Sequence, residues 1–299
     1  MEKAYKRQVA LLLKVLPEVA KENCFALHGG TAINLFVRDM PRISVDIDLT
    51  YLPIEDRTTS LTKISKALDR IKRNIEAVIL GVRVLHKKDT AKLQVSTKDA
   101  DIKVEVNLVG RGVLSDPVKM ELSEKTQNEF DVFAAIQVVP FGQLYGGKIC
   151  AALDRQHPRD LFDVKYLLAN EGFTPEVKRG FLLCLIGSDR PMHEVITPNF
   201  QDQRSALANQ FEGMSGESFS YADYEATREK LIEMIRTTLN EEDRKFLLSV
   251  KSLTPIWTIY DFERFPSIQW KLQNLRKLRE ANPDKHQEQY EALKRKLNP

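Results

Sequence analysis

Two aspartates separated by one isoleucine are the residues of this chain best suited to metal chemistry. Asp46 and Asp48 lie in a segment, residues 44–51, whose apolar positions alternate with polar ones, as expected of a half-buried strand. Side chains of a strand alternate between its faces, so both carboxylates share one face. At an effective dielectric near 20, two carboxylates about 5 Å apart repel by roughly 3 kcal/mol. Mg²⁺ would remove this repulsion, and it favours sites built from a few carboxylates plus phosphate oxygens.

A glycine pair precedes these aspartates at a spacing that could hold phosphate. Gly29, Gly30 and Thr31 follow the apolar residues 25–27, and a helical pattern over residues 33–40 comes next. Glycines allow a sharp turn and a close approach to backbone amides, and a helix N-terminus attracts anions. Gly-Gly alone is usually a turn, and Asp-x-Asp alone is usually a solvated strand face. Their order along the chain favours chemistry on a nucleoside triphosphate.

A second group of charged residues lies near the middle of the chain. Lys148 and Arg155 fall on one helical face, and Asp160 and Asp163 lie one turn apart on a helix that we expect to begin near Pro158. A lysine in such a setting can offset the negative charge of a leaving pyrophosphate. The alternative is an ordinary Lys–Asp or Arg–Asp bridge between two packed helices.

The remaining patterns predict the elements that position these groups. Helices are expected over residues 3–22 and 55–75, and strands over 78–85, 91–96, 102–109 and 133–139, with a polar loop over 110–129. Glu105 lies on the polar face of the strand at 102–109, where Lys103 could simply pair with it. Beyond residue 140 the pattern becomes helical, with a long connection over 187–216 and an N-cap at Asn240. We therefore expect domains at 1–140 and 141–299.

The overall composition is that of a globular protein without a strong field for nucleic acid. The chain has 299 residues, 42% of them hydrophobic, and a formal net charge of only +3. Cys24, Cys150 and Cys184 lack metal-binding spacing and predict buried, reduced thiols. No signal peptide or long apolar span is visible, which predicts a cytoplasmic protein without membrane association.

Taken together, the motifs resemble the nucleotidyltransferase fold of the DNA polymerase β type. Within it, they look most like the AbiEii/AbiGii (MenT-like) toxins of bacterial toxin–antitoxin and abortive-infection systems. The resemblance implies an α+β fold, with a mixed sheet, flanking helices and a helical C-terminal domain that completes the active-site cleft. It also implies Mg²⁺ on Asp46 and Asp48, and a further ligand or base at Glu105. Nucleotide binding would fall to Gly29, Gly30, Thr31, Lys148 and Arg155, and Asp163 matches the catalytic aspartate better than Asp160 does.

The function implied is Mg²⁺-dependent transfer of a nucleoside monophosphate from a nucleoside triphosphate to an acceptor. In this family the acceptor would be a tRNA or other RNA 3′ end, and a cognate antitoxin would neutralise the activity, in a system of antiviral defence. Two alternatives stay open at this point. One is a catalytically silent nucleotide-binding module, and the other is an antibiotic-modifying nucleotidyltransferase.

Overall fold

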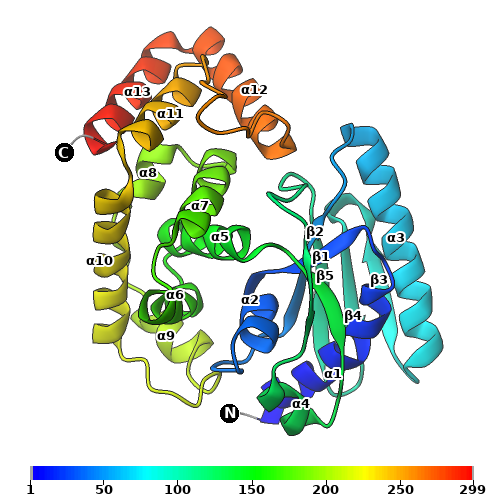
Figure 1. Cartoon of the computed structure of the whole chain (residues 1–299). Helices are drawn as coiled ribbons and strands as arrows, with labels where there is room; N and C mark the ends of the chain where they lie inside the picture. Colours follow the sequence, from blue (N-terminus) through cyan, green and yellow to red (C-terminus); the bar gives the residue numbers. More distant parts are fainter. Residues whose placement is uncertain (1–2, 298–299) are drawn as a thin grey trace. The chain divides into compact units, whose positions relative to one another are not determined.

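The computed structural model describes residues 3–297, which fold into two compact units (Figure 1). One unit comprises the chain up to Pro140 together with Phe211–Ser218. The other comprises Phe141–Gln210 and the chain from Phe219 on. The short segment Phe211–Ser218 thus returns to the first unit, although its sequence lies inside the region that we assigned to the C-terminal domain.

The first unit is built on a seven-stranded mixed sheet with the order β3-β4-β5-β2-β1-β7-β6. The central strand β2 runs antiparallel to β1 and parallel to β5, and β1 runs parallel to β7. The strands are β1 (Phe25–His28), β2 (Asp46–Tyr51), β3 (Arg83–Lys87), β4 (Lys92–Ser96), β5 (Asp101–Asn107), β6 (Val118–Glu121) and β7 (Ala135–Val138).

Two amphipathic helices supply the apolar cover that this sheet needs. The helices α1 (Lys3–Ala20) and α3 (Arg57–Val78) pack on the sheet and on each other. Ile47 and Leu49 of β2 are fully buried, whereas Asp46 and Asp48 are only half-buried. The predicted alternation in β2 is therefore confirmed, and the two carboxylates lie on the face opposite the core residues.

Two predictions about this unit were wrong in part. The expected strand over 78–85 begins only at Arg83, because α3 continues to Val78 and the chain then turns at Gly81, whose φ is 74°. The expected loop over 110–129 contains β6 and the helix α4 (Glu124–Phe130). β6 is an edge strand of only four residues, and its apolar Val118 is exposed, so its alternation is too short to give a clear local signal.

The second unit contains only helices among its described residues. They are α5 (Phe141–Asp154), α6 (Pro158–Asn170), α7 (Pro175–Gly187), α8 (Met192–Ile196), α9 (Arg204–Gln210), α10 (Tyr221–Thr238), α11 (Glu241–Lys251), α12 (Pro266–Ala281) and α13 (Pro283–Leu297). The expected long connection over 187–216 therefore holds two short helices, α8 and α9. The predicted cap at Asn240 is confirmed, since its side chain accepts a hydrogen bond from the Asp243 amide at 2.9 Å.

Glycines bring α5 and α7 into backbone contact. A Cβ added to Gly146 of α5 would lie 2.2 Å from the carbonyl carbon of Gly180 of α7, and one added to Gly180 would lie 1.9 Å from the Gly142 oxygen. Only glycine permits this approach. The contact fixes the position of α5, which carries Lys148.

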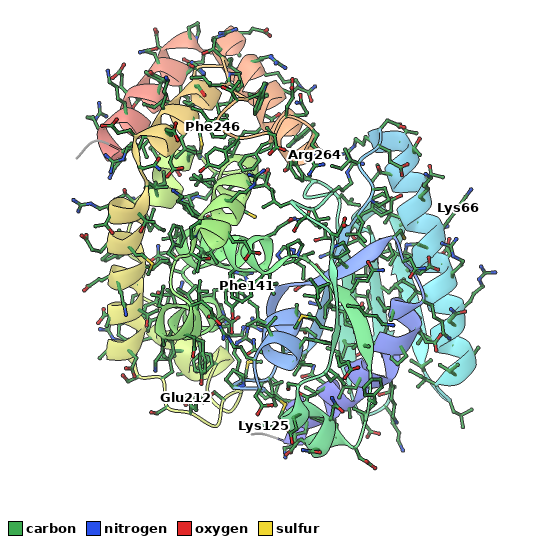
Figure 2. All side chains as sticks on the ribbon, in the orientation of Figure 1. Lys66, Lys125, Phe141, Glu212, Phe246 and Arg264 are labelled. Atoms are coloured by element: carbon green, nitrogen blue, oxygen red, sulfur yellow. The ribbon has the colours of Figure 1, made fainter. Side chains whose placement is uncertain are left out.

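An aromatic cluster forms the core beside α11. Phe246, labelled in Figure 2, packs against Phe262 and Tyr260 with ring centroids 5.8 and 5.0 Å apart.

None of the described helices combines the length and apolarity that crossing a bilayer requires. The three cysteines are free thiols, but each is half-buried and not fully buried as predicted.

Candidate active site

The glycine turn, which begins the short helix α2 (Gly29–Ala32), meets the aspartate pair at one end of β1 and β2. The helical segment expected over 33–40 continues α2 as a π-helical turn and ends at Val37. Gly29 follows β1 with a φ of 72°, in the left-handed region that favours glycine. A Cβ at this position would lie 2.3 Å from Asp48 Oδ2. The Asp48 carboxylate therefore lies directly against the Gly29 backbone.

Gly30 is covered by two side chains that the sequence motifs did not indicate. A Cβ at Gly30 would lie 2.8 Å from Ser44 Oγ and 2.9 Å from the Arg42 guanidinium. Arg42 is a buried cation beside the turn, and it donates a hydrogen bond to the Ile43 carbonyl at 2.8 Å. A single arginine in a loop carries no spacing signal, so only the fold could identify it.

The segment Phe211–Ser218 holds this loop in place within the same unit. The Ser215 hydroxyl donates to the Pro41 carbonyl at 2.9 Å, and the Ile43 amide donates to the Met214 carbonyl at 2.8 Å. Met214 is buried although it lies in a polar stretch. Phe211, three residues earlier, is buried as well, so these two apolar residues in a polar stretch are the sequence signal for this contact.

Thr31 joins the turn to the start of β2. Its hydroxyl is buried and donates to the backbone carbonyl of Asp46 at 2.5 Å. Asn34 adds a second brace, because its side-chain amide donates to the Gly30 carbonyl at 2.9 Å. These bonds fix the turn relative to both aspartates without using their carboxylates.

Glu105 is the register neighbour of Asp48 on the adjacent parallel strand. Its carboxylate forms an ion pair with Lys92 of β4, with Nζ and Oε1 2.9 Å apart. Both side chains are about a third or more exposed to solvent, and pairs of this kind contribute little to stability. Glu105 thus borders the site, but its partner is Lys92 and not the Lys103 that the sequence suggested.

The donors at this site suit a metal that takes most of its ligands from the substrate. Within residues 3–297, no three His, Cys, Asp or Glu side chains are grouped as a metal site. Asp46 and Asp48 offer hard carboxylate oxygens at half-buried positions, next to the glycine turn. Mg²⁺ is commonly held by one or two carboxylates plus substrate phosphates and water, so this pair fits it.

The second group of predicted residues forms a buried ion cluster on α5 and α6. Lys148 Nζ lies 2.9 Å from Asp160 Oδ1 and 3.0 Å from Asp163 Oδ2. All three side chains are at least nine-tenths buried. Arg155, just beyond the end of α5, is mostly exposed and binds Asp160 through two nitrogens, at 2.6 and 3.0 Å.

The cluster is close to electrically neutral, with two cations against two carboxylates. Burial opposes ionisation of Asp160, but Lys148 and Arg155 outweigh it and hold the pKa of this carboxyl well below its usual range. The N-cap of α6 supports the arrangement, because His157 Nδ1 accepts from the Arg159 amide at 3.1 Å. The four charged groups identified from their spacing are therefore brought together within the second unit.

Comparisons with known proteins identify the family of the chain and agree with this fold. A family model described as "Nucleotidyl transferase AbiEii toxin, Type IV TA system" matches residues 10–274. No curated protein sequence matches the chain. Among solved structures, MenT4, a nucleotidyltransferase toxin from Mycobacterium tuberculosis, is similar with a TM-score of 0.63 and 14% sequence identity, over 91% of this chain and 93% of that one. At this identity the likeness shows a shared fold, and the predicted α+β architecture is confirmed.

Proposed function

Because the chain belongs to the AbiEii family of nucleotidyl transferase toxins from type IV toxin–antitoxin systems, we propose that it transfers a nucleoside monophosphate to a tRNA 3′ end with Mg²⁺ bound at Asp46 and Asp48. Family membership makes the protein a nucleotidyltransferase with a nucleoside triphosphate as substrate and a cognate antitoxin as partner. The acceptor, the metal and the residue roles are our proposals.

The observation that carries this proposal is the contact between Asp48 and Gly29. Backbone amides that can approach a phosphate lie beside a carboxylate that can hold a cation. When bound, a divalent metal supplies charge that stabilises the entering and departing oxygens of a phosphoryl transfer. Asp46 and Asp48 would hold it, and the turn would orient the triphosphate through its amides. Thr31 acts by bracing the turn, since its hydroxyl is already bonded to Asp46.

We propose that Glu105 accepts a proton during the reaction and does not hold the metal. Its carboxylate lies one strand away from Asp48 and is balanced by Lys92. If the ion pair opens on substrate binding, Glu105 can accept the proton of the attacking hydroxyl. A Glu105→Gln variant should then lower the transfer rate without weakening metal binding.

For the second unit, we propose that Lys148 serves the same reaction by offsetting phosphate charge, with Asp163 as the functional aspartate and Arg155 as a further phosphate contact. Lys148 is held by two buried carboxylates, which support its charged form. Arg155 is accessible, with 64% of its side chain exposed. An Arg155→Met variant should raise the KM for the triphosphate more than it lowers kcat.

A labelled-nucleotide assay tests the proposal. The wild-type protein, Mg²⁺ and each α-³²P-labelled nucleoside triphosphate are incubated with total tRNA, and the RNA is separated on a denaturing gel. Label should enter RNA, and tRNA whose 3′ diol has been oxidised with periodate should remain unlabelled. Chelation by EDTA should abolish the signal, because two carboxylates cannot replace the metal's charge.

The matched variants are Asp48→Asn and Asp101→Asn. Asp101 is an exposed strand carboxylate of the same unit, at the start of β5. Asp48→Asn should reduce transfer at least about 100-fold, the scale of losing one group that stabilises transition-state charge. Asp101→Asn should match the wild type. Label that enters protein or a small-molecule acceptor, but no RNA, would reject the tRNA proposal and leave the nucleotidyl transfer standing.

A further inference from the structure

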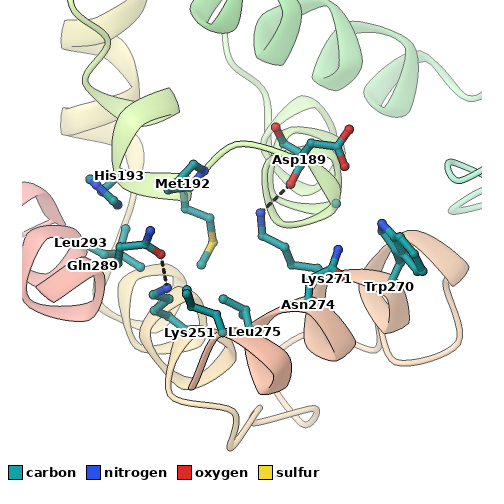
Figure 3. A pocket seen from close by; sticks show the side chains of 14 residues that line it. Asp189, Met192, His193, Lys251, Trp270, Lys271, Asn274, Leu275, Gln289 and Leu293 are labelled. Carbon is teal, nitrogen blue, oxygen red and sulfur yellow. Dashed lines mark hydrogen bonds between the residues drawn. The ribbon is translucent and has the colours of Figure 1, made fainter. Parts of the chain in front are cut away.

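A cavity of about 160 Å³ lies in the second unit, among α8, α11, α12 and α13 (Figure 3). Its wall is mixed in character. Met192, Leu275 and Leu293 contribute apolar surface, Asn274 and Gln289 contribute polar surface, and Trp270 is partly exposed. Two lysines, Lys251 at the end of α11 and Lys271 on α12, line the same space.

The two lysines are unusual because both are buried. Their exposed fractions are 4% for Lys251 and 7% for Lys271, whereas lysine is almost never buried unless it is paired. Among the described residues, no carboxylate lies within ion-pair distance of either ammonium. The negative charge that acts on Lys271 comes from Asp189 and Glu194, beyond ion-pair distance, and Asp189 itself lines the cavity.

Neutral groups satisfy only part of the hydrogen-bonding capacity of these ammonium groups. Lys251 Nζ donates to Gln289 Oε1 at 2.7 Å, the bond drawn in Figure 3. Lys271 Nζ donates to the carbonyls of Ser188 and Arg190, at 2.5 and 2.8 Å. An ammonium has three N–H donors, so these bonds leave two donors on Lys251 and one on Lys271 for another acceptor.

The charges of the lysines point to the nature of that acceptor. Burial, helped for Lys251 by the neighbouring Lys271, lowers the pKa of both side chains to about 8. An anion in the cavity would stabilise both charged forms and restore these values. Because both lysines line the same cavity, an anion with several oxygens could accept hydrogen bonds from both ammonium groups.

We propose that this cavity binds the phosphate group of a small anion, either inorganic phosphate or a phosphate monoester, between Lys251 and Lys271. The purely structural alternative is that Lys271 caps the carbonyls that follow α7 and that Lys251 only braces α13. The two accounts differ in one respect. A capping lysine does not make the stability of the protein depend on phosphate concentration.

Thermal unfolding of the full chain in phosphate tests the proposal. Phosphate should raise the unfolding temperature progressively, and sodium chloride at matched ionic strength should not, because ligand that binds only the folded state stabilises it. Lys251→Met and Lys271→Met should each weaken the apparent affinity at least about tenfold, the scale of one lost charged hydrogen bond. Lys277→Met removes an exposed lysine of the same helix α12 and should leave the affinity unchanged.

Adenosine monophosphate in place of phosphate distinguishes the two ligand sources. A shift with both ligands identifies a site for phosphate monoesters, and a shift with phosphate alone restricts it to the inorganic ion. No shift with either ligand, or equal shifts in the wild type and both methionine variants, would overturn the proposal. Phosphate bound at the proposed nucleotidyl transfer site would also raise the unfolding temperature. The part of the shift that is lost in Lys251→Met and Lys271→Met therefore reports on this cavity, whatever the outcome for nucleotidyl transfer.

A measurement on the wild type covers the case in which the variants do not fold. Limited acetylation with acetic anhydride, followed by mass spectrometry, reports the accessibility of each lysine amine. Phosphate should slow the modification of Lys251 and Lys271 and leave Lys277 unaffected. Unchanged modification of the two buried lysines at saturating phosphate would also reject the proposal.

Discussion

The carboxylate of Asp48 occupies the space that a side chain at Gly29 would need, since a Cβ there would come within 2.3 Å of Asp48 Oδ2. This contact links two motifs that are separated by a helical segment and a loop. Together with the bond from Thr31 to the Asp46 carbonyl, it makes the turn and the carboxylate pair one preorganised unit.

Substitution of Gly29 by alanine should therefore affect activity more than stability. The new Cβ must displace the Asp48 carboxylate, and the left-handed backbone adds about 1–2 kcal/mol of strain. We expect nucleotidyl transfer to fall at least about 100-fold, because misplacement by 1 Å can cost that much. Gly216→Ala is the control, because nothing lies within 4 Å of a Cβ there. Equal rates for the two variants would contradict the assigned role of the turn.

Removal of Lys148 should destabilise the second unit strongly. Lys148→Met leaves two buried carboxylates without their shared partner, which typically costs about 3–5 kcal/mol. The double variant Lys148→Met/Asp163→Asn should be less destabilised than Lys148→Met alone, because it removes one of the stranded charges. Urea unfolding measures both. Transfer measured where each variant is folded then separates catalysis from stability, and strictly additive losses would argue against the cluster.

Acid stability should depend on Asp160. Its folded-state pKa is depressed, so its contribution to the free energy of unfolding is fully present above the unfolded-state pKa near 4 and is lost as the pH falls below that value. Asp160→Asn should lower stability at pH 7 and flatten its dependence on pH between about 4 and 2. Asp284→Asn, an exposed carboxylate on α13, is the control. A variant as acid-sensitive as the wild type would contradict this assignment.

The helix contact between α5 and α7 should not tolerate a methyl group. Gly146→Ala places a Cβ 2.2 Å from the Gly180 carbonyl carbon, and neither backbone can yield without separating the helices. We expect a loss of about 1–3 kcal/mol or more in the free energy of unfolding, measured by urea titration. Because α5 carries Lys148, transfer activity should fall as well. A variant as stable as Gly216→Ala would show that the helices can move apart at little cost.

The buried lysines should make the protein more stable as the pH rises from about 8 towards 10. Their folded-state pKa values lie near 8, below an unfolded-state value near 10.4, so the unfolded state binds more protons in this range. Lys271→Met removes the cost of the buried charge but leaves the Ser188 and Arg190 carbonyls without their donor, so the test is the pH dependence of its stability relative to the wild type. The charged or titratable groups near the two lysines are Asp189, Glu194, His193 and His286, as well as the lysines themselves.

The comparison of wild type and Lys271→Met isolates this effect. Tyrosines and cysteines that titrate at high pH contribute equally to both proteins and cancel in the difference. The free energy of unfolding of the wild type should rise relative to that of Lys271→Met between pH 8 and 10. A difference that stays constant across this range would show that Lys271 is not a costly buried cation.

The sequence by itself determined the features that depend on neighbours along the chain. The alternation around Ile47 placed both aspartates on one strand face because the strand repeat is two residues. The cap at Asn240 followed from a local side-chain-to-backbone bond. The family was also correctly identified from motifs of this local kind.

Only the tertiary structure decided which distant groups meet. In the folded chain Glu105 pairs with Lys92, and Arg42 lies over Gly30. Met214 belongs to the first unit, and Lys251 and Lys271 are buried around one cavity. Lys148 is shared between two aspartates. Such contacts follow from the packing free energy of the whole chain, in which segments far apart compete for the same partners. Local spacing indicates which residues are able to contact each other, but it does not determine which of several possible partners each residue contacts in the folded chain.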